Sequence, residues 1–139
     1  YAQAGLTAVG ERIVTAPQVA LFEKLKARNR LPVRVVMTWR PDSNRPEEEI
    51  EREIRASKWT TNVGDERLKF GTFKVTLDGG QSVGTAYQRM PYGPFGRQLY
   101  GQTDPKSRGT LFVEAEKLYR IFRAARDRNW QLTAHSQGG

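Results

Sequence analysis

The 139-residue sequence contains no cysteine and only one histidine, His135. The lack of cysteine excludes disulfide bonds and thiolate metal sites, and it leaves the redox compartment undetermined. No apolar run approaches the roughly 20 residues that a membrane-spanning helix needs. We therefore expect no membrane partner and a cytoplasmic location, although the sequence does not exclude a signal peptide upstream of Tyr1.

Acidic residues are scarce, because 15 Asp and Glu oppose 23 Lys and Arg and leave a net charge of +8. Such a charge often indicates binding to nucleic acid or to anionic membranes. Here most basic side chains are scattered over expected helix faces among glutamates, and no nucleic-acid-binding motif accompanies them. A basic nucleic-acid-binding module is therefore an alternative interpretation, and no nucleic acid is expected as a partner.

Both ends of the sequence look like interior parts of a longer chain. "YAQAG" is typical of the end of a helix, and "LTAHSQGG" stops directly after an expected strand. We therefore interpret residues 1–139 as an internal fragment of a longer protein. On its own, such a fragment is expected to be inactive and poorly stable.

Strand and helix signals alternate along the chain. In the first expected helix, Leu21, Phe22 and Leu25 are predicted to form the buried face. Strands are predicted at 6–12, 31–39, 70–80 and 130–135, and helices at 15–29, 44–58 and 113–129.

Two segments repeat one structural unit. "LKARNRLPVRV" and "RAARDRNWQLTA" each end a basic helix at an Arg-Asn junction and lead directly into a strand. Asn29 and Asn129 are expected to adopt the left-handed conformation that ends a helix. Repeated helix-to-strand units with short joints indicate parallel strands. We therefore predict an α/β fold that is a partial (β/α)8 TIM barrel with about four parallel strands, and an open doubly wound sheet is the alternative.

The strand in "FGTFKVTLDGG" has a lysine at its centre. If Phe73 and the residues that alternate with it pack on helices, Lys74 faces the barrel interior. The side chains of the last strand alternate between the two faces in the same way, which places His135 on the interior side. It lies at the C-terminal end of the strand, where barrel enzymes carry their chemistry. The pattern alone also allows a lysine in an ion pair and a hydrogen-bonded core histidine.

The segments "LKFGTFKVTLDGGQSVGTAY" and "NWQLTAHSQGG" resemble the amidohydrolase superfamily, and more narrowly the metal-dependent hydrolases that include N-substituted formamide deformylases. "GLTAVGER" and "LPVRVVMTWR" are similar to that family's second and third barrel strands. The resemblance implies that Lys74 is a metal-bridging lysine of strand four, that His135 is the metal ligand of strand five, and that the chain covers about strands two to five. The family's other ligands, a His-x-His pair, a further histidine and an aspartate, are not found in this segment.

The implied activity is hydrolysis of the C–N bond of a small amide-type substrate by a metal-activated water. The chemistry explains a buried lysine, because only the neutral amine adds carbon dioxide to form a carbamate that can bridge two metals. With a reference pKa of about 10.4, roughly one lysine in 2,500 is neutral at pH 7, and burial raises that fraction. The imidazole of His135 suits zinc, so one or two zinc ions are expected.

The stretch 78–112 is a long loop that follows the lysine strand, and loops of this length are often lids. Its glycines and aromatic residues predict a cover over the barrel mouth. Asp78, Tyr87 and, after the strand 31–39, Arg40 are the predicted substrate contacts. Two alternatives stay open: the aromatics pack the loop on the barrel, and Asp78 only forms a turn before two glycines.

A Schiff-base aldolase is a second alternative function. In such an enzyme, a barrel lysine of lowered pKa attacks a carbonyl group. Lys74 fits that role, but the role leaves the nearby His135 without a purpose.

Overall fold

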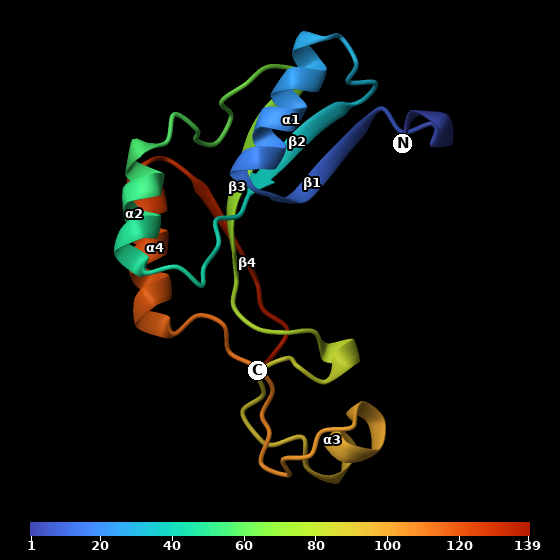
Figure 1. Ribbon diagram of the computed structural model, residues 1–139, viewed down its shortest axis with the longest axis vertical. Coiled ribbons are helices and arrows are strands. Elements are labelled where there is room, and N and C mark those ends of the chain that lie inside the picture. The colour runs from blue at the N-terminus through green and yellow to red at the C-terminus, as the bar shows by residue number, and fades with distance from the viewer.

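The computed structural model describes residues 1–139 (Figure 1). None of its helices is both long and apolar enough to cross a membrane. The elements follow in the order β1 (Ala8–Val14), α1 (Ala16–Ala27), β2 (Arg34–Trp39), α2 (Glu47–Ala56), β3 (Leu68–Thr76), α3 (Gly93–Tyr100), α4 (Ala115–Asp127) and β4 (Gln131–His135), with short 3₁₀ turns at Ala2–Ala4 and Gln81–Val83.

The four strands form one parallel sheet in the order β1-β2-β3-β4. Each strand therefore lies beside its successor, as in a (β/α)8 barrel, whereas a doubly wound sheet reverses its strand order partway. The connections run through α1, α2 and α4. The predicted α/β fold, a partial barrel of four parallel strands with intervening helices, is confirmed.

The repeated helix-to-strand unit is present at both predicted places. Asn29 has φ 53° and Asn129 has φ 60°, the left-handed conformation predicted for both. In each case the next residue donates its backbone N–H to a carbonyl in the last turn of the helix, Arg30 to Leu25 at 2.8 Å and Trp130 to Ala125 at 3.1 Å. The same closure thus ends α1 before β2 and α4 before β4.

One face of the sheet forms the hydrophobic core with α1, α2 and α4. Trp39 of β2 lies at its centre, and its ring centroid is 5.4 Å from that of Phe73 and 5.6 Å from that of Trp130. The fully buried aliphatic side chains that pack around this aromatic cluster come from every layer: Val14, Val19, Ile50, Ile54, Val75 and Ile121. The opposite face, which we call the open face, carries Thr38, Thr72, Lys74, Thr76, Thr133 and His135.

The buried side of α1 differs from the prediction. Leu21 is 53% exposed, whereas Val19 is fully buried and Phe22 packs against the core. Successive helical residues are about 100° apart, so Val19 and Phe22 share a face and Leu21 points away from it. Adjacent apolar residues on a helix cannot all face the core.

We expect the isolated 139-residue chain to self-associate. β1 and β4 are the outer strands of the sheet, so each presents a row of unpaired backbone groups, and Ile13 of β1 is 43% exposed. Sedimentation velocity should show species larger than a monomer that grow with protein concentration, and Ile13→Lys should reduce them. A monomer at all concentrations with one cooperative unfolding transition would contradict this expectation.

Candidate metal and substrate site

Lys74 and His135 lie on the open face, on neighbouring strands. In the pairing of β3 with β4, Lys74 lies opposite Thr133 and Thr76 lies opposite His135. Paired residues of a parallel sheet point to the same side, so the two side chains are one residue pair apart on that side. Both are near the C-terminal ends of their strands. The structure thus brings together the two residues on which the sequence interpretation depends.

The surroundings of Lys74 destabilise its charged form. Burial lowers the pKa of Lys74, and the charges of Arg12 and then Arg40 lower it further. The pairing of β2 with β3 explains the effect of Arg40. Trp39 lies opposite Phe73, so the residues that follow them, Arg40 and Lys74, lie at neighbouring positions. Lys74 therefore loses its proton more readily than an exposed lysine does.

His135 has a ring nitrogen without a partner. Its Nδ1 is buried and makes no hydrogen bond, and the nearest carboxylate oxygen, Oδ1 of Asp78, is 3.5 Å away. Buried polar atoms are normally satisfied, so an orphaned imidazole nitrogen beside a lysine of lowered pKa fits a metal ligand. The fit is incomplete, because the chain holds no cluster of three or more His, Cys, Asp or Glu that could bind a metal ion. This chain can thus supply Lys74 and His135 to such a site and no complete ligand set.

The buried side chain of Asp78 connects the segment after β3 with the tail after β4. Its carboxylate accepts hydrogen bonds from the backbone N–H groups of Tyr87 at 3.1 Å, Gln137 at 3.0 Å and Gly138 at 2.6 Å. Burial raises the pKa of Asp78, but these three donors and the nearby His135 lower it, and the net pKa lies below its usual value. A side chain on Gly138 would collide with the carbonyl of Tyr87, so this junction needs glycine. The carboxylate is thus occupied by backbone groups.

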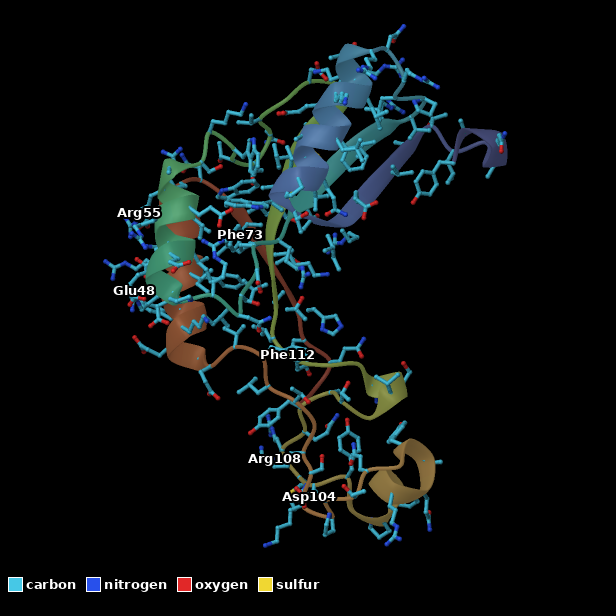
Figure 2. All side chains as sticks on the ribbon, in the orientation of Figure 1. Glu48, Arg55, Phe73, Asp104, Arg108 and Phe112 are labelled. Carbon is cyan, nitrogen blue, oxygen red and sulfur yellow. The ribbon has the colours of Figure 1, made fainter.

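The stretch 78–112 folds into an ordered lobe with one helix, α3. Its two ends run together, where Phe112 N donates to Leu77 O at 2.8 Å and Thr110 N to Thr85 O at 2.9 Å. Figure 2 shows Asp104 and Arg108 on this lobe, beyond the ends of the strands and far from Phe73 in the core. The ring of Tyr87, one of the predicted substrate contacts, lies under the Arg108 guanidinium at 4.8 Å.

Arg12 and Arg40 are the charged groups that act on Lys74. Arg40, a predicted contact, donates its backbone N–H to Val14 O at 3.0 Å, and its side-chain Nε is buried without a partner. Arg12 of β1 was not predicted. Strand alternation from Gly10 would have placed it on the open face, but the irregular pairing between Glu11 and Val14 obscures that alternation.

The parallel strands, the outer helices and the polar groups at the C-terminal strand ends define a segment of an α/β-barrel protein. The model of the amidohydrolase family matches residues 1–139, and the chain belongs to this family.

Two solved structures share the fold over 99% of this chain. One is an uncharacterized metal-dependent hydrolase from Pyrococcus furiosus, with 19% identity and a TM-score of 0.70, and the chain covers 26% of it. The other is an uncharacterized metal-dependent hydrolase from Pyrococcus horikoshii OT3, with 22% identity and a TM-score of 0.72, and the chain covers 25% of it. The chain thus spans about a quarter of these relatives. No curated protein matches it.

Asp78→Ala is expected to release the base of the lobe, because three backbone donors lose their buried acceptor. Limited proteolysis should then cleave within 79–110 at least several-fold faster than in the parent chain. The matched control is Asp104→Ala, since Asp104 is exposed in the same lobe and its side chain accepts only a local hydrogen bond from Lys106 N.

Equal cleavage rates in the Asp78→Ala and Asp104→Ala variants would contradict the anchoring role of Asp78. Far-UV circular dichroism of both variants controls for general unfolding.

Proposed function

We propose that this chain is part of a metal-dependent hydrolase that cleaves the C–N bond of a small amide-type molecule, in the branch that resembles N-substituted formamide deformylases. The observation that carries the proposal is the placement of Lys74 and His135 on one face at the C-terminal strand ends. Membership of the amidohydrolase family supports it. In the proposed assignment, β1 to β4 are strands two to five of the barrel, and the whole protein acts in the cytoplasm.

Lys74 is proposed as a bridging ligand in its carbamate form. The neutral Nζ adds to carbon dioxide and releases one proton, which leaves an anion with two oxygen donors. Burial and the charges of Arg12 and Arg40 promote the deprotonation that must precede this addition. No carboxylate of the chain forms an ion pair with Lys74, so its Nζ is not held in its charged form by an acidic partner.

His135 is proposed as the second ligand, through a neutral imidazole. Its backbone carbonyl accepts the N–H of Leu77 at 2.9 Å, which fixes the end of β4 against β3. Asp78 holds the tail after β4 through Gln137 and Gly138 and so fixes where the imidazole can lie. When bound, one or two divalent ions, most simply zinc, would supply Lewis acidity and an activated water.

The lobe 78–112 is proposed as a lid over the substrate. Asp78 anchors its base, and Tyr87 and Arg108 stiffen the segment next to that anchor. In this arrangement Asp78 and Tyr87 act on substrate binding by holding the lid, and Arg40 contacts the substrate from the open face. A lid over the strand ends would exclude bulk water from the site.

In the full-length protein that carries this chain, Lys74→Ala is expected to lose metal and amide hydrolysis together. Removing a bridging ligand should lower activity by a hundredfold or more, and short carboxylic acids such as propionate should restore part of it by replacing the carbamate. Metal content is measured by atomic absorption and turnover with formamide substrates.

The matched control is Lys69→Ala, because Lys69 lies on the same strand but is exposed and near its N-terminal end, away from Lys74. Full metal content in Lys74→Ala would contradict the ligand role. Trapping of a substrate on Lys74 by borohydride would instead indicate Schiff-base chemistry.

A further inference from the structure

The open face carries two guanidinium groups that have no acidic partner. Arg12 of β1 and Arg40 after β2 take part in none of the ion pairs of the chain. Lys74 does not count with them, because the proposed function gives it an anionic carbamate. Glu11 pairs in register with Met37 and therefore faces the helices. Asp78, at the end of β3, already accepts three backbone N–H groups.

The position of Arg40 is the more demanding of the two. The hydroxyls of Thr38 and Thr72 are 3.1 Å apart, which shows that these residues face the same side of adjacent strands. Two residues further on, Arg40 and Lys74 follow the same register, at a strand spacing of about 4.8 Å. Arg40 Nε is buried there and donates to no acceptor. A buried guanidinium with an unsatisfied donor is unfavourable unless a negatively charged acceptor joins it, and the carbamate oxygens proposed for Lys74 would be engaged with metal.

A carboxylate suits this position. The planar guanidinium presents parallel N–H donors that match the two oxygens of a carboxylate, and such charge-assisted pairs are stronger than neutral ones. Arg12, which is exposed on β1, supplies a second guanidinium on the same side.

We propose that Arg40, assisted by Arg12, binds a carboxylate of the substrate, so that the preferred substrate is an amide that also bears an acidic group. This inference rests on the proposed hydrolase function and adds the class of substrate. Lys74 and His135 serve the scissile amide, while the two arginines orient the molecule from the β1–β2 side.

The test compares two substrates in the full-length protein: N-formylphenylalanine and N-formylphenethylamine, which differ only by the carboxylate. The first should have the higher kcat/KM by about tenfold or more. Arg40→Gln and Arg12→Gln should each reduce that ratio, Arg40→Gln by about tenfold to a hundredfold and mainly through KM. Arg123→Gln on the outer side of α4, exposed and unpaired, should leave the ratio unchanged.

Equal kcat/KM values for the two substrates would overturn the inference. An equal loss on both substrates in Arg40→Gln would also overturn it, because Arg40 would then act on Lys74 and not on the substrate. Arg40→Lys, which keeps the charge but lacks the parallel donors, should retain part of the preference, and circular dichroism checks that each variant folds.

Calorimetry on metal-stripped protein separates the inference from the hydrolase proposal. N-formylphenylalanine should bind at least tenfold more tightly than N-formylphenethylamine, and Arg40→Gln should remove the difference. If neither amide is hydrolysed, the proposed function fails, and this binding difference still decides the role of Arg40. Equal binding of both compounds to the parent protein would overturn that role.

Discussion

The register of β3 against its two neighbours is the constraint on which both the core and the candidate site depend. It places Phe73 opposite Trp39 and Leu132, on the side where the aromatic rings meet. The same pairing places Lys74 on the other side, level with Thr133. Because side chains alternate with a period of two, a slip by one residue would turn Lys74 into the aromatic core and Phe73 out of it. Burial of the aromatic cluster therefore fixes the direction of the lysine, although none of those rings takes part in the chemistry.

Beyond the strands, the site depends on a buried carboxylate. Asp78 is the acceptor at which the end of β3, the base of the lobe and the tail after β4 meet. An uncharged acceptor could satisfy fewer donors, and an empty position would leave three buried N–H groups without a partner. The position of the His135 ring and the direction of the lobe therefore depend on the same side chain. Movement of the lobe as a lid would involve the residues beyond this anchor, toward α3.

Much of the fold could be predicted from the sequence because its signals are local. The Arg-Asn junctions specify where α1 and α4 end, and the alternation around Lys74 specifies its face. α3 could not be predicted, because its glycines disfavour a helix. The residue Gln102 that follows α3 donates its backbone N–H to Gly96 O at 3.1 Å and its side-chain Nε2 to Gly84 O at 2.5 Å, and so ties α3 to the start of the lobe. Arg12 was missed for a related reason, since the irregular pairing of β1 with β2 depends on both strands.

The distribution of ion pairs changes the meaning of the net charge of +8. On the outside, Arg120 of α4 contacts Glu47 at 2.9 Å, Glu48 at 3.1 Å and Glu51 at 2.9 Å, and only a few other cations form ion pairs: Lys26, Arg45, Arg55 and Arg126. On the open face, Arg12 and Arg40 have no such partners. Uncompensated charge of one sign raises the local concentration of oppositely charged ligands. Under the proposed function, Arg12 and Arg40 would use this effect to attract a small anion to the open face, whereas the other unpaired cations are spread over helices and loops.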